Sequence, residues 1–315
     1  MPNGEPNSRA LAIAAQRLGT TVDGKYRIRA VLGLGGMGIV YEAEHLFLGR
    51  SVALKILHPR YADTQEAAAR FLNEARAAGS IGHRAIVQVM DAGFLDGTTP
   101  YLVMERLEGE DLEHRIRRRK GLRVVQAAMV LREMMKGLAA AHAKDIVHCD
   151  LKPANVFLLD KHIDVGTVKI LDFGISKVGE QQTSRTESGE HVLGTPQYMA
   201  PEQVQGGVVS PQTDLFAAGA VVYEALAARP VFPGENRVDL FVQILRDEPA
   251  PLVGNREPVP EAFTQLVLRL LSKSRRQRPA SAADVVKAID EMALLPHNPS
   301  PSIPSIQAVR PRKPD

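Results

Sequence analysis

The chain has 315 residues, of which 44% are apolar and 24% charged, and its formal net charge is +3. This length exceeds one small core, so we expect one large two-lobed unit or two domains. The near-neutral balance does not indicate nucleic-acid binding. The single cysteine, Cys149, excludes an internal disulfide framework and a cysteine-rich zinc site, which is typical of a cytoplasmic protein.

No segment is expected to enter a membrane. The longest apolar run, residues 216–228, is interrupted by Glu224. A membrane-spanning helix needs about 20 apolar residues, so this run predicts a buried core helix. The first ten residues lack a basic region followed by an apolar one, so no secretion signal is expected.

The first part of the chain predicts a small sheet. After a short helical stretch at 9–18, alternating apolar residues predict three antiparallel strands, at 26–33, 39–45 and 51–57. A helix should follow, because Asp63 and Glu66 form a capping-box pattern. Residues 85–93 and 100–107 predict two more strands, which complete a five-stranded sheet with one helix.

After Glu108 the pattern becomes helical. Apolar residues at 127, 130, 131, 134, 138 and 141 form one helical face. Further helices are expected at 199–205, 212–228, 237–247, 261–272 and 281–294, and the Pro- and Ser-rich end predicts a disordered tail. The fold class is therefore α+β, with four predicted parts: an N-terminal extension (1–25), a small lobe (26–107), a helical lobe (108–294) and the tail (295–315).

Two glycine patterns could bind phosphate. The segment GTTVDGKY at 19–26 ends in Tyr26 where a P-loop needs Ser or Thr, and a strand follows it, which argues against a P-loop. The segment GLGGMGIV at 33–40 carries Gly33, Gly35 and Gly38 with G-x-G-x-x-G spacing. Alone it is equally compatible with a plain glycine turn. A dinucleotide-binding loop would open a helix, whereas a strand follows here, so we expect a hairpin tip whose backbone approaches phosphates.

Lys55 and Glu74 extend this interpretation. Lys55 lies in VALK on the third strand, and Glu74 lies 19 residues later on the following helix. Each alone is typical of a solvated surface. Together, after a glycine turn, they indicate a lysine that orients phosphates and a carboxylate that holds it.

Six motifs occur in one order: GLGGMGIV, VALK, Glu74, HCDLKPANV, LDFG and GTPQYMAPE. Over residues 26–294 the chain resembles the protein kinases, specifically the eukaryotic-type serine/threonine kinases that also occur in bacteria. The resemblance implies the two-lobed kinase fold, ATP with Mg²⁺ or Mn²⁺, and protein Ser/Thr hydroxyls as substrates. These substrates would include the chain itself, with a dimer for autophosphorylation, and no nucleic-acid partner.

The resemblance also assigns roles to residues. Asp150 would accept the proton of the substrate hydroxyl, Lys152 would face the transferred phosphate, and Asn155 and Asp172 would hold the metal, with Lys55 and Glu74 completing the catalytic set. Lys152 and Thr195 favour Ser/Thr over Tyr as acceptor. The implied nucleotide-binding residues are Gly33, Leu34, Gly35, Gly36, Gly38, Val40, Ala53, Lys55, Met104, Glu105, Leu107, Asp111, Phe157 and Asp172.

Other positions look structural. The resemblance implies that Glu202 pairs with Arg278 and that Asp214 caps the catalytic loop, and His148 is expected to be a packed core residue. The basic run at 113–121 is interpreted as a solvated helix face, with docking of an acidic partner as the alternative.

Cys149 departs from the family pattern, which has arginine there. In an extended segment its side chain should face away from His148 and Asp150, which argues against a nucleophile. The family arginine pairs with a phosphate on the activation loop, and a thiol cannot. We therefore hypothesise that activity depends little on phosphorylation of the loop hydroxyls, which are Thr183, Ser184, Thr186 and Ser188.

The measurement for this hypothesis is activity on an exogenous protein after all four loop hydroxyl residues are replaced by alanine. We expect the rate to fall less than about tenfold, and a larger fall in a folded variant would contradict the hypothesis.

Two other functions stay open at this point. A pseudokinase would bind nucleotide or partners without catalysis, although every chemical position of the family is present. A kinase of small molecules usually lacks a segment such as GTPQYMAPE.

Overall fold

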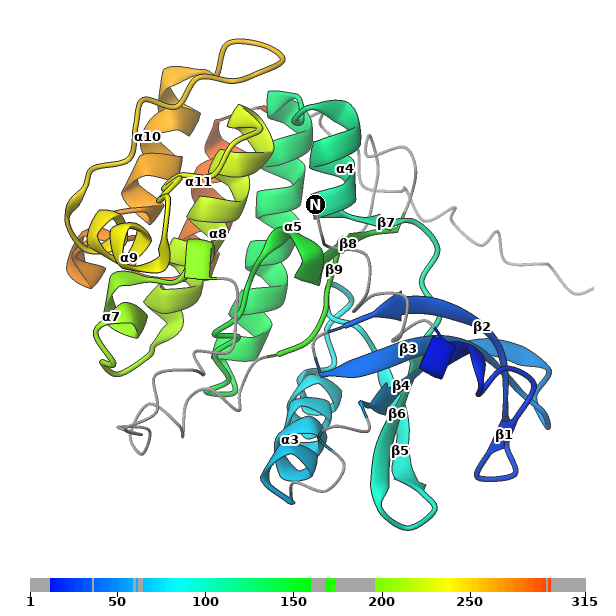
Figure 1. Cartoon of the computed structure of the whole chain (residues 1–315). Helices are drawn as coiled ribbons and strands as arrows, with labels where there is room; N and C mark the ends of the chain where they lie inside the picture. The colour runs from blue at the N-terminus through cyan, green and yellow to red at the C-terminus, as the bar shows by residue number, and fades with distance from the viewer. Residues whose placement is uncertain are drawn as a thin grey trace, which may run out of the picture.

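The computed structural model describes residues 12–35, 37–58, 61, 65–159, 168–173, 196–292 and 294–295. A sheet-rich region with one long helix is followed along the chain by a mainly helical region (Figure 1). This arrangement confirms the predicted two-lobed α+β class.

The main sheet is antiparallel and has six strands in the order β1-β2-β3-β4-β6-β5. Five strands were expected, and the sixth is the short β1, which pairs Thr21 with Arg27 and Val22 with Tyr26. A hairpin turn makes this pairing, with Asp23 and Gly24 at φ 50° and 62°. The turn contains part of the segment that mimics a P-loop, so those residues are the end of a hairpin. The strands are β1 (Thr21–Val22), β2 (Tyr26–Leu34), β3 (Gly38–His45), β4 (Arg50–Leu57), β5 (Val89–Leu95) and β6 (Thr99–Glu105).

Helix α3 (Gln65–Ile81) packs on this sheet through a small apolar cluster (Figure 1). Phe71 and Ala75 of the helix meet Leu57 of β4 and Leu102 of β6 there, and Phe71 is completely buried. This packing fixes the helix that carries Glu74 against β4, the strand that carries Lys55. The predicted N-cap, Asp63, lies outside the described residues.

The second region contains the helices and a small sheet. The helices are α4 (Leu112–Arg119), α5 (Val124–His142), α7 (Pro201–Val204), α8 (Pro211–Ala227), α9 (Arg237–Arg246), α10 (Glu261–Leu270) and α11 (Ala282–Glu291). The small sheet has the order β7-β8-β9, with β7 (Glu110–Asp111), β8 (Val156–Leu158) and β9 (Val168–Ile170). Strand β9 lies between the helices and the main sheet (Figure 1).

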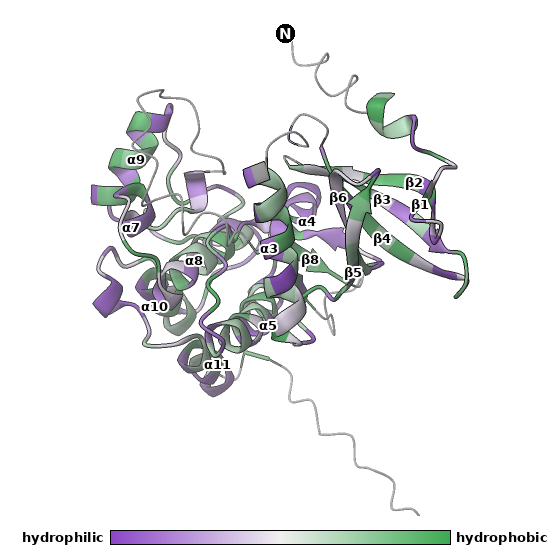
Figure 2. Cartoon of the chain, turned by 90° about the horizontal axis from the view of Figure 1, so that it is seen from below, coloured by the Kyte–Doolittle hydropathy of each residue, from purple (hydrophilic) through white to green (hydrophobic). Residues whose placement is uncertain are grey.

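Helix α8 is the centre of the helical region. Almost all of its residues are buried, Phe216 and Tyr223 completely, and it packs against α5 and α10. Apolar segments of α5 and α8 lie inside this region in Figure 2, with hydrophilic segments toward its rim. The predicted core helix is confirmed. No helix among the described residues combines the length and the apolar character that crossing a bilayer requires.

A buried ion pair joins two distant parts of this region. Arg278 Nη1 and Nη2 donate to the two carboxylate oxygens of Glu202 at 2.8 and 2.9 Å. Arg278 also donates to three backbone carbonyls, and Thr213 donates to Glu202 at 2.9 Å. The predicted pair is therefore confirmed, and its charges are well partnered, as burial demands.

Candidate functional site

Asp214 of helix α8 holds the loop that carries Asp150. The Asp214 carboxylate accepts hydrogen bonds from the backbone N–H groups of His148 and Cys149 at 2.8 and 2.9 Å. His142 Nε2 lies 2.8 Å from the same carboxylate. Asp214 is 1% exposed, so its polar atoms need these partners. The predicted capping role of Asp214 is confirmed.

His148 is a structural residue, as expected. Its ring is completely buried, and Nδ1 accepts the backbone N–H of Asp150 at 3.2 Å. Nε2 therefore carries the proton and donates to the Leu171 carbonyl at 2.9 Å. Burial lowers the pKa of His148 despite the nearby carboxylates of Asp214, Asp150 and Asp172. Both nitrogens are engaged, so His148 is not positioned as a base.

Cys149 adopts a different backbone conformation from the one expected. Its φ is 64°, in the left-handed region, so the prediction of an extended segment is wrong. This conformation accompanies the two successive N–H groups that Asp214 binds. The thiol lies 3.7 Å from the Val147 carbonyl, which cannot activate it as a nucleophile.

Asp150, Lys152 and Asn155 form one compact turn. Lys152 Nζ lies 3.1 Å from Asp150 Oδ2, and Asn155 Nδ2 donates to the Asp150 carbonyl at 2.9 Å. Pro153 opens a short 3-10 helix that places Asn155. The backbone of Asn155 accepts from Leu171 N–H at 2.9 Å, so this turn lies beside the residue before Asp172.

Lys55 and Asp172, 117 residues apart, form an ion pair of 2.6 Å. The Lys55 side chain is 8% exposed and that of Asp172 is 47% exposed. Burial alone would lower the pKa of Lys55, but the charges of Asp172 and Glu74 outweigh it and raise this pKa. Desolvation would raise the pKa of Asp172, but the charge and hydrogen bond of Lys55 hold this pKa below its usual range. Both groups are therefore charged at neutral pH, and Glu74 acts on Lys55 electrostatically.

The glycine segment forms the turn between β2 and β3. Gly33 and Leu34 end β2, and Gly35 N–H donates to the Gly38 carbonyl at 2.8 Å. A Cβ on Gly38 would lie 2.6 Å from the Ile56 carbonyl, so this position admits only glycine without a shift of β4. Gly36 lies outside the described residues. The predicted hairpin tip is thus present as a turn between two strands.

Five more of the predicted nucleotide-binding residues lie opposite another predicted residue on a paired strand. Val40 is the cross-strand partner of Lys55, and Ala53 is that of Met104. Asp111 is the partner of Phe157 in the small sheet. Leu107 lies in the segment that joins β6 of the main sheet to β7 of the small sheet. The implied pocket residues therefore lie on these two sheets and on the segment between them.

Asp111 has a structural job that the sequence did not reveal. One of its carboxylate oxygens accepts from His114 N–H at 2.8 Å, and the other lies 2.7 Å from His114 Nδ1. Asp111 is therefore the N-cap of α4. Its implied contact with a ribose stays a prediction.

Glu105 also makes structural contacts that the sequence did not predict. Its backbone lies at the end of β6, but its carboxylate Oε1 accepts from Gln88 N–H at 2.7 Å and from Lys169 Nζ at 2.5 Å. The sequence did hold a signal for Lys169, because a lysine inside the buried strand VKI needs a charged partner. The pattern could not name that partner.

Asn155 and Asp172 fit a hard divalent cation. The hydrogen bond from Nδ2 fixes the Asn155 amide and leaves its oxygen on the other side, while the Asp172 carboxylate stays accessible. Mg²⁺ and Mn²⁺ prefer such oxygen ligands. The described residues contain no group of three or more His, Cys, Asp or Glu that could hold a metal.

The structure does not describe five of the predicted residues, which are Thr195 and the activation-loop residues Thr183, Ser184, Thr186 and Ser188. The basic run predicted at 113–121 is α4 and the turn after it, and two of its arginines, Arg115 and Arg118, contact Glu110. Arg115 is 3% exposed, so the prediction of a wholly solvated face is wrong at that residue.

Comparison with known proteins agrees with this geometry. A family model described as "Protein kinase domain" matches residues 26–289. The chain is 38% identical over 278 residues to "Serine/threonine-protein kinase Pkn1" of Myxococcus xanthus, across 87% of this chain and 39% of that protein. It is 33% identical over 273 residues to "Serine/threonine-protein kinase pkn3" of the same organism, across 84% of this chain and 49% of that protein.

A third relative comes from another genus. The chain is 35% identical over 277 residues to "Serine/threonine-protein kinase PknA" of Mycobacterium tuberculosis, across 87% of this chain and 63% of that protein. The chain thus spans about half or less of the two Myxococcus proteins and under two thirds of the mycobacterial one. The family model covers well over half of the residues, and the chain therefore belongs to the protein kinase family.

Proposed function

We propose that this protein is an ATP-dependent serine/threonine kinase that transfers the γ-phosphate of Mg–ATP to hydroxyl groups of proteins. The supporting observation is the 2.6 Å ion pair between Lys55 and Asp172, next to the turn that carries Asp150 and Asn155. This arrangement joins a phosphate-orienting lysine, a metal-binding carboxylate and a base, which are the parts that phosphoryl transfer requires.

Each residue has a distinct task in this proposal. Lys55 and the glycine turn orient the phosphates, and Glu74 keeps Lys55 charged. Asp150 accepts the proton of the attacking hydroxyl, while Lys152, 3.1 Å from it, faces the transferred phosphate. Asn155 and Asp172 would hold Mg²⁺ or Mn²⁺, which supplies charge neutralisation at the phosphate oxygens.

Lys152 and the names of the relatives, each a serine/threonine-protein kinase, support serine and threonine as the acceptors. We also propose that a second copy of this chain is among the substrates, through a transient dimer. A cytoplasmic location is part of the proposal, because the reaction consumes ATP and the one cysteine suits a reducing compartment.

The test is transfer of labelled phosphate from ATP to a generic protein substrate with Mg²⁺, beside the Asp150→Asn variant. We expect label on Ser and Thr after hydrolysis of the product, and none above background with the variant. Equal labelling by both would contradict the proposal and favour a nucleotide-binding scaffold. Label on a small metabolite alone would favour a small-molecule kinase.

Replacing Lys55 by methionine is expected to lower kcat/KM about a hundredfold, because one preorganised cation at the phosphates is lost. The measurement is steady-state phosphate transfer to the same protein substrate.

The matched control for this variant is Lys25→Met, which removes a lysine with a 46% exposed side chain from the turn between β1 and β2. Its activity should equal that of the wild type. A Lys55→Met protein with kcat/KM within tenfold of the wild type would contradict the role assigned to Lys55.

A further inference from the structure

Glu105 and Lys169 form an ion pair at the end of β6, the strand end that is proposed to meet the adenine ring. Glu105, the last residue of β6, directs its carboxylate to Lys169 Nζ at 2.5 Å. The same oxygen accepts from Gln88 N–H at 2.7 Å, and Glu105 N–H donates to the Gln88 carbonyl at 3.0 Å. Gln88 is therefore bonded to both the backbone and the side chain of Glu105.

Lys169 connects this contact to the helical region. It lies in the middle of β9, is 9% exposed, and also donates to the Ile86 carbonyl at 3.3 Å. Its cross-strand partner is Phe157, another residue of the proposed nucleotide pocket. Asp172 follows three residues later. One ammonium group thus fixes the end of β6, the loop before β5 and the strand that leads to Asp172.

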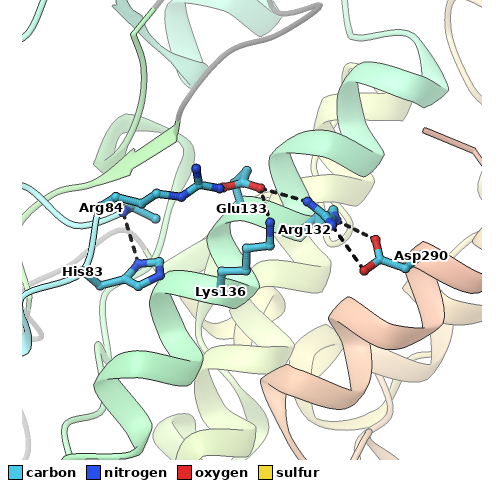
Figure 3. A network of polar contacts seen from close by, with 7 residues as sticks. His83, Arg84, Arg132, Glu133, Lys136 and Asp290 are labelled. Carbon is cyan, nitrogen blue, oxygen red and sulfur yellow. Dashed lines mark hydrogen bonds and ion pairs between the residues drawn. The ribbon is translucent and has the colours of Figure 1, made fainter. Parts of the chain in front are cut away.

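The loop before β5 has a second, separate attachment. Arg84 Nη2 lies 2.9 Å from Glu133 Oε2 on α5, and Glu133 also meets Lys136 at 2.7 Å and Arg132 at 3.2 Å. Arg132 reaches Asp290 on α11 at 2.6 Å (Figure 3). This network attaches the loop to the helices and does not include Glu105, so it provides a control for general loosening of the loop.

We infer that Lys169 is a positioning residue for the nucleotide, which acts by holding Glu105 and with it the backbone of residues 104–107. The inference rests on the proposed function, since it requires that this backbone meets ATP. The side chains of Lys169 and Glu105 are 11% and 26% exposed, and a partly buried pair of this kind orients its neighbours when both members are present. The loss of one member leaves a poorly partnered charge beside the strand end, which then adopts other positions.

The experiment measures KM for ATP and kcat at saturating protein substrate. Lys169→Met should raise KM for ATP about five- to tenfold and change kcat less than about twofold, because the contact acts equally on bound substrate and transition state. Lys169→Arg should recover most of the affinity, since a cavity of about 310 Å³ adjoins Lys169 and admits the longer group. Arg84→Met, with a side chain 65% exposed, should keep the wild-type KM.

A double-variant cycle separates positioning from a general structural effect. If Lys169 acts through Glu105, then Glu105→Gln with Lys169→Met should raise KM no more than either change alone. Multiplied effects would overturn the inference, as would an unchanged KM in Lys169→Met or an equal rise in Arg84→Met.

Nucleotide binding without transfer keeps this test separate from the proposed function. Displacement of a fluorescent ATP analogue gives affinities even when no phosphate is transferred. A wild-type protein that binds ATP but does not phosphorylate proteins would refute the proposed function alone. If Lys169→Met does not fold by circular dichroism, Lys169→Gln carries the same expected rise, and an unchanged affinity in that variant overturns the inference.

Discussion

The Asp150→Asn variant is expected to transfer phosphate about 10³–10⁴-fold more slowly than the wild type. The carboxylate is the proton acceptor in the proposed reaction, and an amide cannot take its place. The backbone contacts of residue 150 to His148 and Asn155 do not use its side chain, so the turn should keep its shape. KM for ATP should therefore stay within about twofold, since the nucleotide is held by other residues.

Asp145→Asn is the matched control for this change. Asp145 is exposed and has φ 56°, a left-handed conformation that asparagine adopts about as readily as aspartate. The Asp145→Asn substitution removes one negative charge five residues from Asp150 and should leave the rate of phosphate transfer unchanged. A rate within tenfold of the wild type in Asp150→Asn would exclude Asp150 as the base.

Arg278→Met is expected to lower the free energy of unfolding by about 3–5 kcal/mol. The substitution leaves the Glu202 carboxylate buried without its bidentate partner, and three carbonyls lose a donor. For a chain of this size, the melting temperature should fall by roughly 10 °C. Arg276→Met, at an exposed position two residues earlier, should change it by less than about 2 °C.

The pH dependence of this difference follows from Glu202. Desolvation would raise the pKa of Glu202, but the hydrogen bonds and charge of Arg278 hold it below the ordinary value of 4.5. The stabilisation is therefore complete above about pH 4.5 and is lost as the pH falls through the lower, folded pKa. Chemical denaturation of the wild type and of Arg278→Met between pH 3 and 7 measures the difference in their free energies of unfolding. A difference that stays constant over this range would contradict the role assigned to Glu202.

The sequence predicts the parts of the fold and site that local patterns encode. Alternation along β2, β3 and β4 identifies the strands because one face of each is buried, and the motif order places Lys55, Asp150 and Asp172 in one site. Register also follows once the strands pair, so Val40 lies opposite Lys55. The pair of Glu202 with Arg278 was predicted from the family resemblance, and the structure contains it.

Contacts between distant segments could not be predicted in the same way. Glu105 and Lys169 are 64 residues apart, and only the folded chain decides which carboxylate a buried lysine meets. Strand β5 begins at Val89, later than the expected residue 85, because residues 85–87 bond to Ile170 of β9. The short β1 depends on a turn of Asp23 and Gly24, and two-residue strands carry no periodicity.

The way that Asp214 holds the loop has a consequence for sequence variation at position 149. The contacts that shape this turn use the N–H groups of His148 and Cys149 and the Cys149 carbonyl, which Gln203 Nε2 binds at 2.9 Å. All of them are main-chain groups, which every amino acid except proline supplies. Cysteine at position 149 therefore preserves the contacts that hold the loop beside Asp150. The geometry of the turn thus does not depend on an arginine side chain at this position.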